Sequence, residues 1–312
     1  MKRIKILSAI SALVLLTACS DSTEESQLPR EKGITSTVSE ATGKTDFDLS
    51  LIAQASRTSA LLEKYPNIKL TYTMDYGEIY NEVMTISRNS KGQPYFVSIS
   101  DGDSEYYDGA NNYWQETHEG ETLCYAQLSL RDAPPMDMEN YIFTYSTEDG
   151  LTVTDYTQTD DGSYIITAEE IYTERYELEN NETAAIELKY EYVISTTPDH
   201  ELTGMKCTCT DSETGEVDST LDLTVEYEAV TPVLPDFMND TYVITAAVTR
   251  HDGTELTEEF EVPEGFMPYF STPDDGDYKF SLDPDGLEII DTMDITGPCT
   301  VYVLPLTDTA AD

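Results

Sequence analysis

The sequence predicts a mainly β fold of the α+β class: one long N-terminal helix packed on a curved antiparallel sheet, an open half-barrel, followed by a small C-terminal β unit. Apolar residues recur at helical spacing in one segment near the N-terminus. After that segment they alternate with polar residues through most of the remaining chain, which is typical of strands with one solvated face. Two prolines within four residues then interrupt the alternation, and the final β unit begins after them.

The N-terminus carries a short basic segment and then an apolar run from Ile6 to Leu16. Such a run is a signal-peptide core and is too short to span a bilayer. It ends in the sequence LTAC at Cys19, which resembles the lipobox of bacterial lipoproteins. The resemblance implies that residues 1–18 are removed and that a lipid is joined to the Cys19 sulfur, with enough acyl chains for a stable anchor. The alternatives are an ordinary signal peptide with an unrelated cysteine and an uncleaved anchor helix.

The lipid on Cys19 would hold the protein on the extracytoplasmic face of the cell membrane. In a cell with two membranes, Ser20 favours the outer one by the sorting pattern of the lipoprotein family. Residues 19–44 hold the lipidated cysteine and a stretch rich in Ser, Thr, Glu and Gly, which we expect to be a flexible tether. No later stretch is apolar enough for a membrane helix.

The mature chain is strongly acidic. Without residues 1–18 it has 14 basic and 61 acidic residues, a formal net charge of −47. Such a charge argues against nucleic acid as a partner and favours cations and basic partners. Solubility of a tethered protein is the simpler explanation of the same charge.

The helix is predicted over about 47–65, within a domain of residues 45–236. Thr45 and Asp48 have the spacing of a capping box, and Pro66 ends the pattern. The apolar positions at helical spacing are Phe47, Leu51, Ala55, Leu62 and Tyr65.

The alternating segments after Pro66 predict an antiparallel sheet of at least about eight strands. They lie at residues 70–74, 84–86, 95–99, 113–116, 165–167, 186–194, 205–209 and 221–227. We place a domain boundary after Asp236 and a small β unit over 237–306, with a frayed tail at 307–312. Its strands are expected at Tyr242–Val248, Leu256–Val262, Tyr278–Leu282 and Val301–Leu304.

Four cysteines remain beside Cys19, and export permits disulfides with three possible connectivities. They are Cys124, Cys207, Cys209 and Cys299. Alternate residues of one strand point to one face, so Cys207 and Cys209 cannot easily join each other. We interpret the cysteines as small buried hydrophobic residues and leave their pairing open.

No catalytic motif, cofactor-binding motif or complete metal-binding motif occurs in the sequence, so we expect a protein that is not an enzyme. The histidines His118, His200 and His251 lie near turns among acidic neighbours, where solvated side chains are expected. The acidic turns lack the full spacing of a calcium loop. With 61 carboxylates, a chance pair of the glycosidase type stays an alternative.

Twenty-two tyrosines are the feature with most functional interest. Their high strand propensity is one explanation. The alternative is that several line a concave face and present an apolar body with a polar tip to an amphiphilic ligand. The candidate ligand-binding residues are Tyr72, Tyr95, Tyr107, Tyr113, Trp114, Tyr190 and Tyr192.

Residues 46–236 resemble the LolA/LolB-type lipoprotein carriers. The resemblance is carried by LLEKY at 61–65, LTYTM at 70–74 and SEYYDGANNYWQ at 104–115. It implies an apolar hollow between helix and sheet. The C-terminal unit is similar to the β-grasp-like internalin B-repeats, through its Asp-Gly turns and the closing Val301-Tyr302-Val303, although the usual tryptophan and the repeated array are missing.

The leading hypothesis is therefore a membrane-anchored, non-catalytic lipoprotein that binds a lipid or other amphiphile in that hollow. The alternative is a surface interaction or structural lipoprotein with a filled core and envelope proteins as partners.

Overall fold

The computed structural model describes residues 45–118, 120–132, 136, 138–143, 151–177 and 183–306. The predicted signal peptide, the predicted lipidation site Cys19, the predicted tether up to residue 44 and the tail from residue 307 lie outside the described residues. None of the described helices is long and apolar enough to cross a membrane.

The mainly β class is confirmed, but the long N-terminal helix is wrong. Two short helices replace it, α2 (Ser50–Ala55) and α3 (Thr58–Lys64). At the break, the backbone N–H of Ser56 closes the last turn of α2 on the carbonyl of Ile52. The buried Ser56 hydroxyl accepts a hydrogen bond from the backbone N–H of Leu202 at 3.0 Å. A tertiary contact thus ends the helix inside an unbroken helical pattern, and the predicted half-barrel around one long helix is wrong as well.

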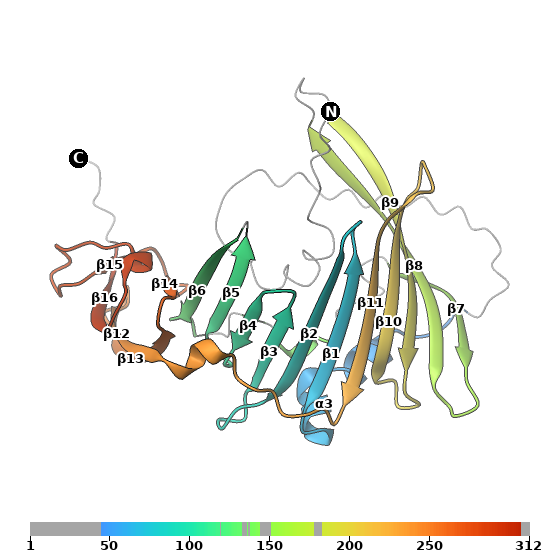
Figure 1. Cartoon of the computed structure of the whole chain (residues 1–312), viewed down its shortest axis with the longest axis horizontal. Coiled ribbons are helices and arrows are strands. Elements are labelled where there is room, and N and C mark those ends of the chain that lie inside the picture. Colours follow the sequence, from blue (N-terminus) through green and yellow to red (C-terminus); the bar gives the residue numbers. More distant parts are fainter. Residues whose placement is uncertain are drawn as a thin grey trace. The chain divides into compact units, whose positions relative to one another are not determined.

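Twelve strands form the larger sheet, in which most neighbours are antiparallel and β14 runs parallel to β6 (Figure 1). The spatial order is β14 (Met267–Ser271), β6 (Glu121–Ser129), β5 (Asn112–His118), β4 (Ser104–Tyr107), β3 (Pro94–Ser100), β2 (Ile79–Arg88), β1 (Ile68–Asp75), β11 (Val217–Tyr227), β10 (Leu202–Asp211), β9 (Thr183–Thr196), β8 (Tyr164–Glu177) and β7 (Thr152–Gln158).

A smaller mixed sheet is built from C-terminal strands alone. Its order is β13 (Glu255–Pro263), β12 (Thr241–Thr249), β16 (Cys299–Pro305) and β15 (Tyr278–Ser281), and the central pair β12 and β16 is parallel. The short 3-10 helices are η1 (Met138–Asn140), η3 (Asp236–Asn239) and η4 (Thr292–Asp294).

The chain divides into two compact units that are not continuous in sequence. Of the described residues, the first unit holds those within 45–64, 72–79 and 136–225. The second unit holds those within 65–71, 80–135 and 226–306. The C-terminal strands therefore share a unit with β2 to β6.

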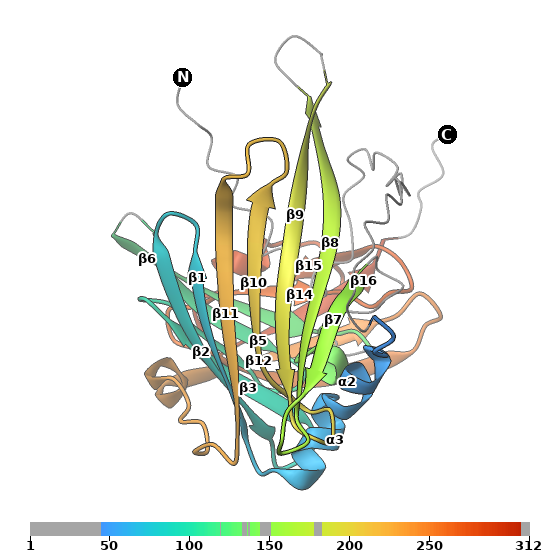
Figure 2. The same ribbon diagram turned by 90° about the vertical axis from the view of Figure 1, so that its right-hand side faces the viewer.

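The first unit contains the long strands β8 to β11, which run side by side in Figure 2. Their register places four buried side chains in one row, Ile166, Ile194, Met205 and Leu223. The α3 helix is tied to this sheet by Lys64, whose Nζ lies 2.5 Å from a carboxylate oxygen of the buried Glu201. Aliphatic packing and local polar contacts therefore stabilise this unit.

The four cysteines that are described have free thiols. Cys207 and Cys209 are buried on β10, and they lie opposite Tyr192 and Tyr190 of β9. Burial raises the pKa of the Cys207 thiol to about 12, so it stays protonated at neutral pH.

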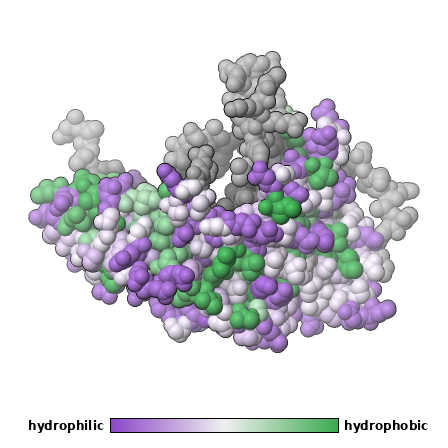
Figure 3. All heavy atoms as spheres, viewed as in Figure 1, coloured by the Kyte–Doolittle hydropathy of each residue, from purple (hydrophilic) through white to green (hydrophobic). Residues whose placement is uncertain are grey.

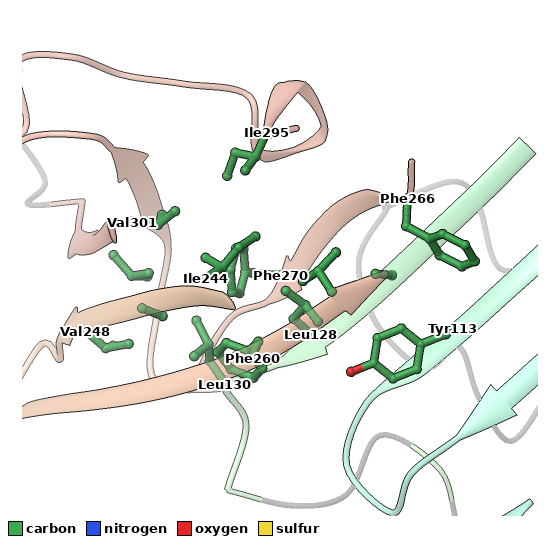
Figure 4. Packing of buried hydrophobic residues seen from close by; sticks show 14 residues of the cluster. Tyr113, Leu128, Leu130, Ile244, Val248, Phe260, Phe266, Phe270, Ile295 and Val301 are labelled. Carbon is green, nitrogen blue, oxygen red and sulfur yellow. The ribbon is translucent and has the colours of Figure 1, made fainter. Parts of the chain in front are cut away.

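In the second unit, an apolar core lies between the smaller sheet and strands β5, β6 and β14 (Figure 4). Phe260 of β13 packs edge to face on Phe270 of β14, with ring centroids 5.5 Å apart. The hydroxyl of Tyr113 donates to the backbone carbonyl of Glu261 at 3.0 Å. This core covers one face of β5 and β6. The side chains on the opposite face of these two strands lie outside the core cluster.

Candidate functional site

The other face of β2 to β6 and β14 carries carboxyl, amide and aromatic side chains, next to a buried apolar patch of Met84, Ile86, Phe96 and Tyr107. We call it the acidic–aromatic face. It has a polar cluster, Glu82, Ser98, Glu105 and Asn112, and an aromatic cluster, Trp114, Tyr125 and Tyr269. All seven residues belong to the second unit.

Strand register brings these side chains to one face, because directly paired residues of neighbouring strands point the same way. Ser98 of β3 pairs with Glu105 of β4, and Glu105 pairs with Trp114 of β5. Trp114 in turn pairs with Tyr125 of β6. Glu82 reaches the same face from β2, since it lies two residues from the Met84 that pairs with Ser98.

Two short hydrogen bonds organise the polar cluster. The Ser98 hydroxyl donates to Oε1 of Glu82 at 2.5 Å. The Nδ2 group of Asn112 donates to Oε1 of Glu105 at 2.6 Å. Ser98 and Asn112 are buried, whereas both carboxyl residues are half-buried. Each carboxyl is thus held by one neutral donor from the next strand.

Burial controls the ionisation of the two carboxyls. It raises the pKa of Glu105 to about 7, and the charge of Glu82 adds to the shift while the Asn112 hydrogen bond opposes it. Burial also raises the pKa of Glu82, and the Ser98 hydrogen bond opposes this shift. Near neutral pH, Glu105 therefore exchanges between its protonated and ionised forms.

One hydrogen-bond acceptor of Asn112 has no partner in the described chain. Its side chain is 6% exposed, and its Oδ1 atom is buried with no hydrogen-bond partner within the described parts of the chain. An unmade hydrogen bond of this kind costs about 1–3 kcal/mol. Buried polar atoms are normally paired, so an exception at the centre of a polar cluster calls for an explanation.

The aromatic cluster lies beside the polar cluster along β5, β6 and β14. Trp114 stacks on Tyr125 with ring centroids 5.2 Å apart. It meets Tyr269 edge to face at 5.8 Å. All three side chains are partly exposed. Aromatic faces can therefore meet a ligand next to the carboxyl groups.

The arrangement suits binding through hydrogen bonds and aromatic contact. Within the described residues, no group of three or more His, Cys, Asp or Glu side chains could hold a metal ion. The histidines His200 and His251 lie outside this face, and His200 packs on Phe47 and Tyr164 of the first unit. Side-chain donors inside the polar cluster come only from Ser98 and Asn112, among the residues that the structure describes.

The sequence-predicted ligand residues do not form one wall. Of the candidates in the second unit, Tyr107 and Trp114 lie on the acidic–aromatic face, and Tyr107 is only 1% exposed. Tyr95 and Tyr113 point to the opposite face of the same strands. In the first unit are Tyr72, Tyr190 and Tyr192, of which Tyr190 stacks on Tyr192 at 6.5 Å.

Sequence reasoning missed Glu82, Glu105, Asn112, Tyr125 and Tyr269. Glu82 precedes the alternating Met84 and Ile86, and Glu105 lies between Ser104 and Tyr106, so neither carboxyl stands out in the local sequence. Register across β2 to β5, which local sequence does not encode, is what brings them together.

Neither a protein-family model nor a curated protein matches the chain. A search of solved structures gives the hypothetical lipoprotein YmcC from Escherichia coli K12, with 13% sequence identity. The match covers 53% of this chain and 89% of YmcC, at a TM-score of 0.13. A TM-score this low does not establish a common fold, so the chain is assigned to no family.

Proposed function

We propose that the protein is a lipid-anchored, extracytoplasmic, non-catalytic binding protein whose ligand contacts the acidic–aromatic face. The lipobox at Cys19 supports the anchor. The observation that carries the binding role is the buried, unpartnered Oδ1 of Asn112 in a cluster of half-buried carboxyls beside Trp114. Polar groups that cost stability without a partner are expected where a ligand supplies one.

The face favours a ligand with polar groups over an acyl chain. A lipid in a hollow was expected from one long helix packed on the sheet, and that helix is absent from residues 47–65. Covering the cluster with hydrocarbon would remove the two carboxyl groups from water and leave Oδ1 of Asn112 without a partner, at a cost of several kcal/mol. An amphiphile that binds here would do so through its polar group.

Two features support binding over catalysis. The chain has no catalytic motif. Each carboxyl also accepts a hydrogen bond from a neutral side chain of the neighbouring strand, Ser98 or Asn112, which is the kind of contact expected in a binding site.

Native mass spectrometry of the mature chain with Cys19→Ser tests this proposal. The protein is mixed with the polar and the lipid fractions of an envelope extract, each in a separate experiment. We expect a stoichiometric ligand from the polar fraction that Trp114→Ala removes. Gln115→Ala is the matched control, because Gln115 is the next residue of β5 and points to the opposite face.

Binding from the lipid fraction alone, insensitive to Trp114→Ala, would contradict the placement of the ligand. Turnover of an envelope glycan that a single Glu105→Gln change abolishes would contradict the non-catalytic role. A clean apo mass with both fractions would favour an interaction lipoprotein with protein partners.

A further inference from the structure

The polar cluster has more acceptors than donors. Two carboxyl groups and the Asn112 carbonyl converge from β2, β4 and β5, and the Ser98 hydroxyl and Asn112 amide are the donors that reach them. Each of these donors meets an Oε1 atom, and Oδ1 of Asn112 has no partner in the described chain. When Glu105 is ionised, a ligand that completes this set has to bring hydrogen-bond donors.

The carboxyls also lack a counter-ion. In the part of the chain that the structure describes, neither Glu82 nor Glu105 forms an ion pair. No Lys or Arg side chain is among the groups that shift the pKa of either residue. Buried carboxylates are normally paired with a cation or coordinate a metal, and no three-ligand metal cluster exists in the described chain.

We propose that the polar cluster and Trp114 bind the ammonium or guanidinium group of an organic cation. This inference rests on the proposed function, and it names the ligand class for the same face. Such a group supplies several N–H donors and a positive charge to Glu82, Glu105 and Asn112. Trp114 and Tyr125 are partly exposed and stack on each other, and a cation over an aromatic ring is stabilised by about 0.5–2 kcal/mol.

The charge of the whole protein fits the same ligand class. The mature chain has a formal net charge of −47. Hydrophilic side chains cover much of the surface in Figure 3. A strongly acidic protein concentrates cations near its surface and repels anionic ligands.

Binding should be coupled to the ionisation of Glu105. Facing this carboxyl are the charged Glu82 from β2, the neutral Ser98 from β3, and Asn112 and Trp114 from β5. A bound cation stabilises the ionised form, so the pKa of Glu105 falls from about 7 and a proton leaves on binding. The affinity is therefore expected to rise roughly tenfold from pH 6 to pH 8.

Trp114 is the single tryptophan of the chain, so its fluorescence reports on this face directly. The mature chain with Cys19→Ser is titrated with spermidine and, separately, with an amidated triarginine peptide. Tighter binding of the peptide would identify a basic polypeptide segment as the source of the cation, and tighter binding of spermidine would identify a free polyamine. Calcium chloride at matched ionic strength is the control for nonspecific binding of positive charge, because calcium has no N–H donors.

We expect saturable binding that strengthens with pH, and a loss of at least tenfold in affinity with Glu105→Gln. Glu116→Gln removes an exposed carboxylate from the same face of β5 and should leave both affinity and pH dependence unchanged. Circular dichroism checks the fold of each variant. If Glu105→Gln does not fold, the pH dependence of the wild-type affinity still tests whether the cation binds at Glu105.

The inference would be overturned if calcium chloride changed the Trp114 fluorescence as much as the organic cations do. It would also be overturned if the affinity for the organic cations did not change between pH 6 and pH 8. The neutral sugar N,N′-diacetylchitobiose separates the two proposals. If the sugar binds in a Trp114-dependent way and neither cation does, the ligand class is wrong while the binding face stands. If the polar envelope fraction also gives no Trp114-dependent ligand, the proposed function fails too.

Discussion

The two faces of strands β3 to β6 are built from the same chain segments and differ in how well their polar groups are satisfied. On the core face, Tyr113 is 2% exposed and its hydroxyl has a backbone partner. On the acidic–aromatic face, Asn112 is nearly as buried, and its Oδ1 has none among the described residues. Neighbours in sequence thus lie in opposite situations. The core face stabilises the fold, whereas the other face combines the buried Phe96 and Tyr107 with an unsatisfied acceptor at Asn112, which we attribute to ligand binding.

This contrast is physically costly to maintain. Half-buried carboxyls with raised pKa values and an unpaired amide oxygen lower the free energy of unfolding. Proteins commonly accept such a cost at sites where function requires it. Changes on the core face should therefore destabilise the protein, and some changes on the other face should stabilise it.

The largest effect is expected from Leu128→Ala. Leu128 is fully buried in the core, and its truncation leaves a cavity that should lower the free energy of unfolding by about 2–5 kcal/mol. Gln127→Ala is the matched control on the other face, where only the hydrogen bond to Ser271 is lost, at about 1 kcal/mol. Urea unfolding followed by Trp114 fluorescence measures both. Equal losses would contradict the distinction between the faces.

A second test uses pH. Because the folded-state pKa of Glu105 is raised to about 7, folded protein binds more protons than unfolded protein between about pH 4.5 and pH 7. The contribution of Glu105 to stability is full below this window and is lost as the pH rises through it. Glu105→Gln should therefore stabilise the protein at pH 8 by on the order of 1–3 kcal/mol, and change little at pH 4.

Thermal unfolding of wild type, Glu105→Gln and Glu116→Gln at both pH values measures this difference. Glu116 is exposed on the same strand, so its variant should follow wild type. A Glu105→Gln protein that is less stable than wild type at pH 8 would show that the carboxylate is already satisfied.

The smallest effect is expected from Tyr113→Phe. The variant keeps the packed ring and removes the hydrogen bond to the carbonyl of Glu261, which should cost about 1 kcal/mol. Since burial raises the pKa of Tyr113 above its ordinary value, this cost should not vary between pH 6 and pH 9. Chemical denaturation at both pH values measures it. A cost that changes with pH would mean that the Tyr113 hydrogen bond is coupled to the ionisation of Glu105 on the other face.

Local sequence predicted much of the strand content. The alternating segments around Tyr72, Val97, Tyr192 and Cys207 lie in β1, β3, β9 and β10. It missed β6, which is buried on both faces for part of its length, and β14, which contains Pro268. The parallel pairing of β14 with β6 joins residues far apart in sequence, and no local pattern encodes it.

The prediction of one long helix was wrong for a related reason. The apolar spacing from Phe47 to Tyr65 satisfies a helical pattern, but the bond between the Ser56 hydroxyl and the Leu202 N–H is a long-range contact. The candidate site was missed because its polar residues are ordinary at each position. Only their register makes Glu82, Glu105 and Asn112 neighbours, so Trp114 was predicted and its acidic partners were not.

The most direct test of the account is the titration of Glu105 itself, by carbon NMR of its side-chain carboxyl group, with and without spermidine. The Glu105→Gln spectrum assigns the resonance. We predict a midpoint near pH 7 for the free protein and a clear fall of that midpoint when spermidine is bound. A midpoint at the ordinary glutamate value, or one that spermidine leaves unchanged, would contradict the assignment of this face as a cation-binding site.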